Sequence, residues 1–441
     1  MPSRAAPATP SARFLLALGL LALLGLALRL WLAQGDLWLD EIWSWKLARE
    51  VHSPLEVWRV AHDNNHPLNT LWMHLLGDSA GALAYRALSI ASGTVAVLCA
   101  GFLGARRSPF AGLACALLAA TSTLLAYYSS EARGYAPAVA CFLGGWLALE
   151  RAQESGSPRA MLVWWLCAAL GLCSHFTFVF GWAALAAGSL GRPFARVLKL
   201  HLPPAALVLA IYFGFVRGMA YGGGDEWSWS AVWIEALGWT FGTPQTLAFA
   251  VLGSLLLLGA LLLERRAALV PALLLLAPPL ATALILRPDF VALRYFSVPL
   301  AGVLILLGRA LERLPRVVGL LLLALIALHN GLRDVQLARA GRGQFRAALE
   351  YMAAQTPAPG MTLSSDLPFD TRLTVEYHSR GLVKAIQWFQ KPPAEGVDWW
   401  IVTEHERAPQ LALGVRHYAL ARVFEAAGPS SYTWALYRRL P

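Results

Sequence analysis

Charged residues are scarce in this sequence of 441 residues, in which Asp, Glu, Lys and Arg together make up 14%. A soluble protein carries roughly 25% charged residues. Hydrophobic residues account for 57% of the chain, and the mean hydropathy is +0.53. The shortage of charge therefore excludes an ordinary soluble domain and predicts an integral membrane protein. The 18 Trp residues fit the interfacial belts of a bilayer.

Cysteine is also rare, with five residues that all fall inside apolar runs. The sequence has no C-x-x-C pair and no Cys/His ligand spacing, so we expect neither a disulfide framework nor a thiolate zinc site. The triplet D-x-D is missing too, so nothing indicates a nucleotide diphosphate held by a metal. We expect no required cofactor, and the sequence leaves the need for a divalent metal undecided.

A net charge of +10 could suggest a nucleic-acid-binding protein. However, much of the Arg and Lys lies in short turns between apolar runs, and no basic stripe is interleaved with aromatics. Basic residues in such turns set the topology of a membrane protein. We therefore predict no nucleic-acid partner.

Helices that cross a bilayer need about twenty apolar residues. The sequence contains eleven candidate spans. Residues 161–190 are the hardest to assign, because thirty residues with His175 in the middle are too many for one span and few for two. We interpret them as a tight helical hairpin. The predicted spans are Phe14–Ala33, Leu83–Leu103, Phe110–Tyr128, Tyr135–Leu149, Met161–Ser174, Phe176–Leu190, Leu200–Val216, Thr246–Leu263, Leu269–Leu286, Tyr295–Gly308 and Val317–Asn330.

The basic turns predict the orientation of these spans. Arg4 and Arg13 precede the first span, which favours a cytoplasmic N-terminus. With eleven spans, every later turn on that side is also basic, as the positive-inside bias requires. We therefore expect a multi-pass protein of the plasma (inner) membrane with an extracytoplasmic C-terminal domain. The basic turns hold Arg106/Arg107, Arg151/Arg159, Arg192/Arg196/Lys199, Arg265/Arg266 and Arg309/Arg313/Arg316.

This topology leaves three long segments outside: residues 34–82, residues 217–245 and the tail from about residue 331. In the tail, "FRAALEYMAAQ" has helical spacing, whereas "DWWIVTE" and "YTWALYRRL" are typical of strands. We predict a transmembrane domain over residues 1–333, with 34–82 as its first outer loop. Residues 334–441 then form a small extracytoplasmic α/β domain.

The unusual polar residues gather at the predicted outer ends of the spans. The stretch "LWLDEIWSWK" places two adjacent carboxylates just past the first span, where a charge is costly unless it is satisfied. Carboxylates can act as general bases, and arginines can hold phosphate by forked hydrogen bonds. We expect one polar cavity at the outer boundary. Its candidate residues are Asp40, Glu41, Asp63, His66, Glu131, Arg133, Tyr135, His175, Arg294 and Tyr295.

The predicted location restricts the substrate. Nucleotides are not expected outside the cytoplasm, so the activated donor that fits is a sugar carried on a lipid phosphate. The phosphate gains negative charge as the sugar leaves, and arginine can stabilise that charge without a metal. Sugar transfer from a lipid phosphate is therefore the leading interpretation.

These pieces together resemble the GT-C superfamily of membrane glycosyltransferases. The resemblance is closest to glycosyltransferase family 39, the protein O-mannosyltransferase and aminoarabinose transferase-like group. It covers roughly residues 10 to 335. The chain departs from the family at "HPLNTLW", where relatives more often read His-Pro-Pro-Leu followed by aromatics. The matching pieces are "LWLDEIWSW", "DNNHPLNTLW", "SSEARGYA", "SHFTF" and "LRYFSVPL".

The resemblance implies an inverting transfer of a hexosyl or pentosyl group to the hydroxyl of a glycan, lipid or protein acceptor. It implies that Asp40 is the general base and that Glu41 orients it or binds the sugar. Asp63 and His66 would line the same pocket. The remaining roles implied are organisation of the site by Glu131 and Arg133, and binding of the lipid phosphate by Arg133 and Arg294.

Structural interpretations stand beside these roles. Asp40 and Glu41 could be a solvated pair that starts an interfacial helix. His66 could cap a loop, and His175 could be a hydrogen-bonded hairpin residue. The final alternatives are a salt bridge between Glu131 and Arg133, and interfacial anchoring by Arg294 and Tyr295.

Two other function classes also remain. A multi-pass transporter or lipid flippase would favour charges at mid-span and broken helices in paired repeats. Here the charges gather at one face, and no internal repeat stands out. A structural subunit whose tail binds partners would leave the carboxylates and arginines unexplained.

Overall fold

The chain forms two compact units. The computed structural model describes residues 10–219, 228–282, 291–403, 407–430 and 432–440. The first unit, here called the helical unit, comprises Met1–Trp31 and Leu47–Val335. The second, the tail unit, comprises Leu32–Lys46 and Gln336–Pro441. A short segment after the first span thus belongs with the far end of the chain, which the sequence did not predict.

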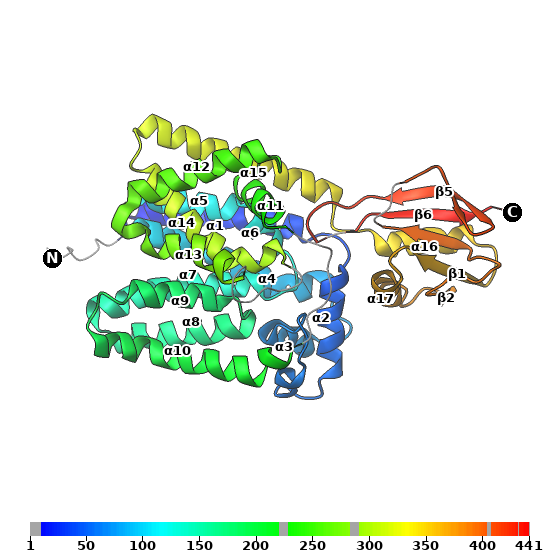
Figure 1. Cartoon of the computed structure of the whole chain (residues 1–441), viewed down its shortest axis with the longest axis horizontal. Coiled ribbons are helices and arrows are strands. Elements are labelled where there is room, and N and C mark those ends of the chain that lie inside the picture. Colours follow the sequence, from blue (N-terminus) through cyan, green and yellow to red (C-terminus); the bar gives the residue numbers. More distant parts are fainter. Residues whose placement is uncertain (1–9, 220–227, 283–290, 404–406, 431, 441) are drawn as a thin grey trace. The chain divides into compact units, whose positions relative to one another are not determined.

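Helical structure matches each of the eleven predicted spans, so the predicted polytopic α-helical fold is confirmed (Figure 1). Within the described residues, six helices are long and apolar enough to cross a membrane, and α5, α8, α9 and α13 are shorter apolar helices. Residues 220–227 and 283–290, which include the end of the ninth predicted span, lie outside the described residues. The helices that match the predicted spans are α1 (Ala12–Leu32), α4 (Ala82–Ala105), α5 (Pro109–Thr121), α6 (Thr123–Tyr128), α7 (Tyr135–Ser155), α8 (Pro158–Ser174), α9 (Phe178–Gly188), α10 (Phe194–Gly214), α12 (Leu247–Glu264), α13 (Leu269–Ala281), α14 (Ser297–Leu311) and α15 (Arg316–Ala340).

Shorter helices fill the connections between these spans. The predicted hairpin over residues 161–190 is confirmed, because α8 and α9 meet at His175. The third predicted span is divided in two at Ser122, where α5 ends and α6 begins. The connecting helices are α2 (Leu39–Glu50), η1 (Glu56–Arg59), α3 (Pro67–Leu76), η2 (Val216–Gly218), α11 (Trp229–Phe241), η3 (Arg265–Ala268) and η5 (Leu293–Phe296).

Serine side chains fix several helix starts. Ser108 accepts a hydrogen bond from the backbone N–H of Ala111, and Ser157 accepts one from Ala160. Each of these serines is followed by a proline at the first helical position, where the missing N–H costs nothing. Ser122 caps α6 in the same way. These polar caps therefore mark where α5, α6 and α8 begin.

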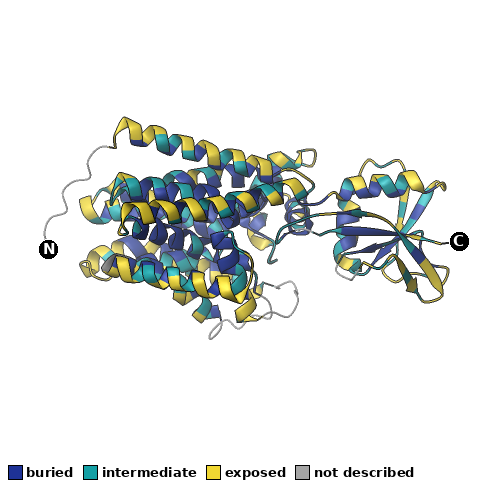
Figure 2. Cartoon of the chain, turned by 90° about the horizontal axis from the view of Figure 1, so that it is seen from above, coloured by how far each residue is buried: buried dark blue, intermediate teal, exposed yellow. Residues whose placement is uncertain are grey.

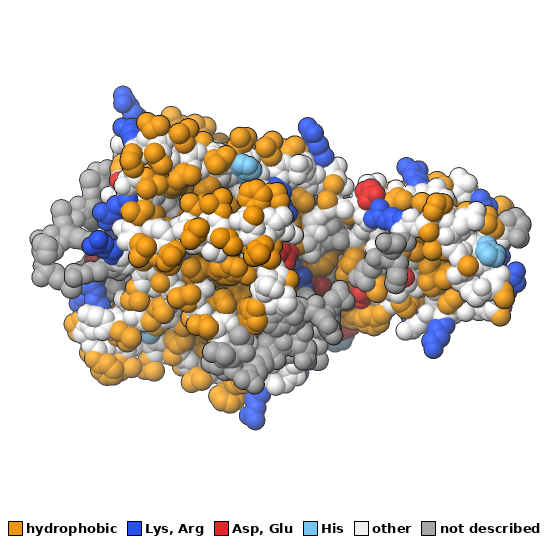
Figure 3. Space-filling model, turned by 45° about the horizontal axis from the view of Figure 1, so that its top comes forward, with side chains coloured by type: hydrophobic (Ala, Val, Ile, Leu, Met, Phe, Trp, Pro, Cys, Tyr) orange, Lys and Arg blue, Asp and Glu red, His pale blue; other side chains and the backbone are white. Residues whose placement is uncertain are grey.

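The helical unit is buried at its centre and hydrophobic on its outside. Helix α14 is buried along nearly its whole length. Cys115 of α5 packs so closely on Gly308 of α14 that a Cβ there would lie 2.8 Å from the Cys115 nitrogen. Small residues allow such contacts between spanning helices. Figure 2 shows exposed outer helix faces, and Figure 3 shows them covered largely by hydrophobic side chains, as expected of a lipid-facing surface.

The tail unit is a six-stranded sheet with two helices. The strand order is β2-β1-β3-β6-β5-β4, parallel for β2-β1-β3 and antiparallel for the rest. The predicted helix and the two predicted strands correspond to α16, β3 and β6, so the small α/β domain is confirmed. Its elements are α16 (Phe345–Gln355), β1 (Gly360–Ser365), α17 (Pro368–His378), β2 (Ala385–Trp388), β3 (Trp399–Val402), β4 (Gln410–Leu413), β5 (Arg416–Phe424) and β6 (Trp434–Arg439).

The segment Leu32–Lys46 is fastened to the tail by polar and apolar contacts. The Arg342 guanidinium donates to the carbonyl of Leu32 at 2.9 Å, and the backbone N–H of Arg346 donates to Asp36 at 2.8 Å. Trp38 and Leu39 then join the buried core formed by α16, α17 and the sheet. Burial of two large apolar side chains is worth several kcal/mol, at about 1.5–3 kcal/mol each.

Candidate functional site

The connection between α6 and α7 is a buried turn that carries Glu131 and Arg133. Both side chains are almost fully buried. The turn's carbonyls are satisfied by neighbouring helices. Asn69 of α3 donates to the carbonyl of Ala132 at 2.7 Å, and Ser89 of α4 donates to that of Arg133 at 2.8 Å. Since buried carbonyls need such partners, α3 and α4 hold the turn in one conformation.

A glycine at the end of this turn, Gly134, leaves room for the α8–α9 hairpin to pack closely against the turn. A Cβ on Gly134 would overlap the carbonyl oxygen of Ser174 and lie 3.0 Å from Nδ1 of His66. The close approach therefore brings His66, at the start of α3, and His175, after α8, to the start of α7. Three segments that are distant in sequence converge there.

The rings of this region form a contiguous stack. The His66 and His175 ring centroids are 4.7 Å apart with an interplanar angle of 30°. Tyr135 lies 4.7 Å from His175 and 5.4 Å from His66, and Tyr295 lies 6.1 Å from His175. His175 Nδ1 lies 2.7 Å from the hydroxyl oxygen of Thr177, so the hydrogen-bonded hairpin interpretation is confirmed. His66 is the N-cap residue of α3 but its side chain makes no capping bond, so that interpretation is wrong.

Two arginines give the stack a positive environment. The guanidinium of Arg133 donates to the amide oxygen of Asn64 at 2.5 Å and lies 5.7 Å from the Tyr135 ring centroid. Arg294 lies 5.8 Å from the ring of Tyr295. Burial, and then the charges of Arg133 and Arg294, lower the pKa of His175 to about 3. Burial and Arg133 also place the pKa of His66 well below 6.5. Both imidazoles are therefore neutral at pH 7, and the positive charges that act on them are those of Arg133 and Arg294.

Asp63 lies at the edge of this cluster. Its carboxylate is 2.9 Å from Nδ1 of His62 and accepts a longer hydrogen bond, 3.4 Å, from the amide of Asn64. Because Asn64 also binds Arg133, Asp63 is connected to the arginine through one amide. Asp63 is only partly buried.

Asp40 and Glu41 belong to the tail unit, at the first turn of α2. Asp40 is 8% exposed and Glu41 is fully buried, so the solvated-pair interpretation is wrong. Glu41 accepts a hydrogen bond from the backbone N–H of Trp38 at 3.2 Å, the contact that a Glu in the first turn makes in a capping box. Burial, and then the charge of Asp40, raise the pKa of Asp370 in α17. Asp40 therefore interacts with a second carboxyl group within the tail unit.

The flanking tryptophans also belong to the tail unit. Trp43 stacks on Phe369 with ring centroids 6.1 Å apart. Trp45 packs against Tyr377 at 5.2 Å, and the Arg380 guanidinium lies 3.8 Å from its ring centroid. The tryptophans around the carboxylate pair thus fix α2 against α17.

The helical unit brings together eight of the ten predicted residues, or places them at the edge of the cluster. Asn64, Asn69 and Ser89 complete this region and were not among the predicted site residues. Arg86, fully buried in α4, was also missed, although a charge inside a predicted span was a usable signal. Among the described residues, no group of three or more His, Cys, Asp or Glu side chains is arranged to hold a metal ion. The eight residues are Asp63, His66, Glu131, Arg133, Tyr135, His175, Arg294 and Tyr295.

Comparison with known proteins finds the fold but no sequence relative. No protein-family model and no curated protein matches the chain. A crystal structure of ArnT from Cupriavidus metallidurans bound to undecaprenyl phosphate is similar over 97% of this chain and 98% of that one. It has a TM-score of 0.52 and 12% sequence identity.

A cryo-EM structure of the arabinofuranosyltransferase AftD from Mycobacteria matches 98% of this chain and 40% of that one. It has a TM-score of 0.47 and 13% sequence identity. The similarity to ArnT extends over nearly the full length of both chains and includes helices and tail. The chain therefore shares its fold with ArnT.

Proposed function

We propose that the protein is a glycosyltransferase of the plasma (inner) membrane that moves a sugar from a polyprenyl-phosphate donor to an acceptor hydroxyl. In this proposal the N-terminus is cytoplasmic and the tail unit is extracytoplasmic. The observation that carries it is the cluster of Arg133 and Arg294 around neutral His66 and His175, at one end of apolar spanning helices. The fold it shares with ArnT, a protein crystallised with undecaprenyl phosphate, is consistent with a lipid phosphate as part of the donor.

The chemistry assigns a separate task to each charge. Asp40 takes the proton from the acceptor hydroxyl, whose oxygen attacks the anomeric carbon of the donor. The bond between that carbon and the phosphate oxygen breaks, the phosphate keeps the electron pair, and the configuration inverts. Arg133 and Arg294 stabilise the charge that develops on the phosphate, as positioned cations do for a leaving group.

The neutral imidazoles fit this arrangement. A neutral histidine can accept or donate a hydrogen bond without adding charge. His66 and His175 can therefore contact sugar hydroxyls beside the arginines. Tyr135 and Tyr295 offer ring faces to the same sugar. The acceptor can be a glycan, a lipid or a protein.

The test is release of labelled sugar from lipid. The purified full-length protein is incubated with a panel of polyprenyl-phosphate hexoses and pentoses and a membrane extract as acceptor source. We expect label to leave one donor. Arg133→Lys and Arg294→Lys should reduce both turnover and donor binding by about tenfold or more, because an ammonium cannot form the arginine fork.

Arg159→Lys is the matched control, since Arg159 is exposed and lies at the start of α8, far along the helix from His175. Loss of affinity for the acceptor alone in the Arg133 and Arg294 variants would overturn the phosphate assignment. Movement of intact lipid across vesicles, with no sugar released from any donor, would favour a flippase.

A further inference from the structure

A polar cavity lies at the end of the helical unit opposite to the cluster of His66 and His175. It has a volume of about 380 Å³. Helix α7 begins at Tyr135 in the cluster described above and reaches this cavity with Trp146 and Gln153. At 1.5 Å per residue these positions are roughly 17–27 Å further along the helix. The cavity is therefore separate from the proposed sugar-transfer site, and it lies among the turns predicted to be cytoplasmic.

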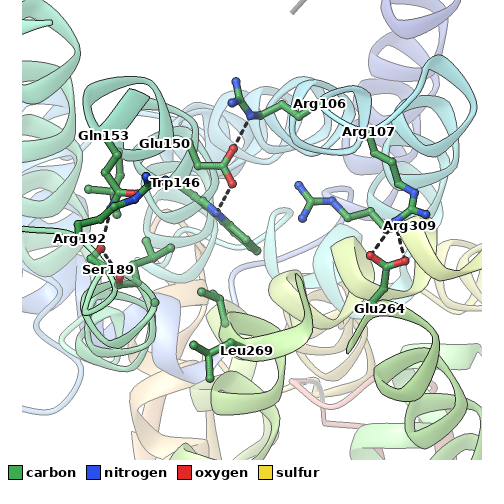
Figure 4. A pocket seen from close by; sticks show the side chains of 14 residues that line it. Arg106, Arg107, Trp146, Glu150, Gln153, Ser189, Arg192, Glu264, Leu269 and Arg309 are labelled. Atoms are coloured by element: carbon green, nitrogen blue, oxygen red, sulfur yellow. Dashed lines mark hydrogen bonds and ion pairs between the residues drawn. The ribbon is translucent and has the colours of Figure 1, made fainter. Parts of the chain in front are cut away.

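The walls of this cavity combine arginines with apolar side chains (Figure 4). Trp146 lies in the wall and donates through its indole N–H to Glu150 at 3.1 Å. The apolar part comes from α7, α9 and α13 and comprises Leu149, Leu185, Leu269 and Val270. Such a lining suits a ligand with a charged group and an adjoining hydrophobic part.

Two of the cavity's arginines are neutralised by neighbouring carboxylates. Arg107 contacts both oxygens of Glu264, at 2.7 and 2.9 Å, and Glu312 at 2.5 Å. Arg106 contacts Glu150 at 2.5 Å and also Glu154. These pairs leave little net charge on that side of the cavity.

Arg309 of α14 has no such counter-ion. Its guanidinium donates to the backbone carbonyl of Leu103 at 2.7 Å and lies 5.7 Å from the ring of Trp146. Its Nε is buried without a hydrogen-bond partner, and no carboxylate among the described residues lies within ion-pair distance. Arg192, an exposed residue at the rim of the cavity, also makes no ion pair within the described part of the chain. A partly buried cation without a counter-ion is costly unless an anion binds it.

We propose that this cavity binds the phosphate group of an anionic phospholipid of the surrounding membrane. Arg309 and Arg192 hold the phosphate, and the apolar wall receives the adjoining glycerol and acyl carbons. Basic pockets between spanning helices at the cytoplasmic side of a membrane bind lipid head groups in this way. A soluble phosphate offers the same oxygens, so the experiment has to separate the two sources.

The test measures lipid binding to the purified full-length protein by native mass spectrometry. Dioleoylphosphatidylglycerol is titrated against dioleoylphosphatidylcholine, with inorganic phosphate as a competitor. We expect retention of phosphatidylglycerol over phosphatidylcholine, and a dissociation constant about tenfold or more higher in Arg309→Gln, as for loss of a charge-assisted contact. Arg192→Gln should weaken binding in the same direction, and its exposed position keeps the test valid if Arg309→Gln misfolds.

Arg316→Gln is the matched control, because Arg316 is an exposed arginine at the same end of the unit and does not line the cavity. If millimolar phosphate displaces the lipid and itself binds in an Arg309-dependent way, the anion site stands and its ligand is soluble phosphate. Equal binding of the two lipids without phosphate binding, or equal losses in Arg192→Gln and Arg316→Gln, would overturn the proposal.

Discussion

At the scale of single residues, the adjacent carboxylates at the start of α2 differ in their surroundings. Glu41 is fully buried and accepts the backbone N–H of Trp38, so it contributes to the start of the helix. Asp40 keeps slight exposure and interacts with Asp370. The chemical role therefore fits Asp40 better, and the structural role fits Glu41.

We expect Asp40→Asn to lower the rate of sugar transfer by about a hundredfold or more, because the amide keeps the shape and loses the base. The measurement is turnover of labelled donor by purified variants of equal yield. Asp78→Asn is the control, since the Asp78 side chain is 72% exposed and, among the described residues, pairs with Arg49 alone. Near-parental turnover in Asp40→Asn would refute the base assignment.

The neutral histidines predict a stability that depends on pH. The ordinary pKa of 6.5 applies to the unfolded chain, whereas His175 in the folded protein has a pKa of about 3. As pH falls below about 6.5 the unfolded state binds protons first, so stability falls, by up to about 1.4 kcal/mol per pH unit for each such group.

The thermal midpoint of the detergent-solubilised protein should therefore drop between pH 7.5 and 5. The drop should be smaller in His175→Gln, which cannot be protonated. His52→Gln, at an exposed position, should keep the parental profile. Identical slopes in all three proteins would show that His175 does not carry the effect.

At the scale of elements, the convergence of α7 with the α8–α9 hairpin depends on one missing side chain. We expect Gly134→Ala to destabilise the protein by about 1–3 kcal/mol, because the added Cβ overlaps the Ser174 carbonyl and forces the hairpin away. The turnover of the donor by Gly134→Ala should also fall, since His175 lies in that hairpin. Thermal midpoints and single-turnover rates measure the two effects.

Gly331→Ala serves as its comparison, because a Cβ at Gly331 of α15 meets nothing within 4 Å. That variant should match the parent or exceed it slightly in stability, as alanine favours a helix. If both variants behave alike, the close approach at Gly134 is not what positions the hairpin.

The elements also show what local sequence can and cannot predict. Long apolar runs predicted the spans, because a helix that crosses a bilayer needs about twenty apolar residues. The tail helix α16 was predicted from its spacing, because burial of one helix face repeats apolar residues with the period of the helix. The division at Ser122 and the assignment of α2 were missed. Both depend on contacts with distant residues, such as the bond from Thr123 to Asn330, which no local pattern encodes.

The site was predicted to a similar extent. The predicted topology placed charged and aromatic residues at one end of the spans. In the structure, most of these residues lie close together in the helical unit. The supporting residues, such as Asn69 and Ser89, are ordinary polar residues on α3 and α4. They matter because they donate hydrogen bonds to the carbonyls of Ala132 and Arg133, and these contacts can be seen only in the folded structure.

At the scale of the whole molecule, the orientation in the membrane can be measured directly. Cysteines introduced at the exposed positions Gln34 and Gln355 should react with an impermeant reagent added to intact cells. A cysteine at exposed Arg192 should react only after permeabilisation. Basic turns on the opposite side give the reason for this orientation. Failure of the cysteine at Gln34 or Gln355 to react from outside would disprove the predicted eleven-span topology. The parent protein is the control, because it shows any labelling of the five native cysteines.

The tail unit's dependence on Leu32–Lys46 has a consequence for biosynthesis. About 290 residues separate that segment from its partners in the chain. At roughly 5–20 residues per second, translation of that length takes about 15–60 s before even the first of these partners is made. During this interval Trp38 and Leu39 have no core to enter and expose apolar surface beside the bilayer. Biogenesis of this protein therefore includes a waiting period, in which a nascent-chain chaperone or the membrane interface has to shield the segment until the last residues are made.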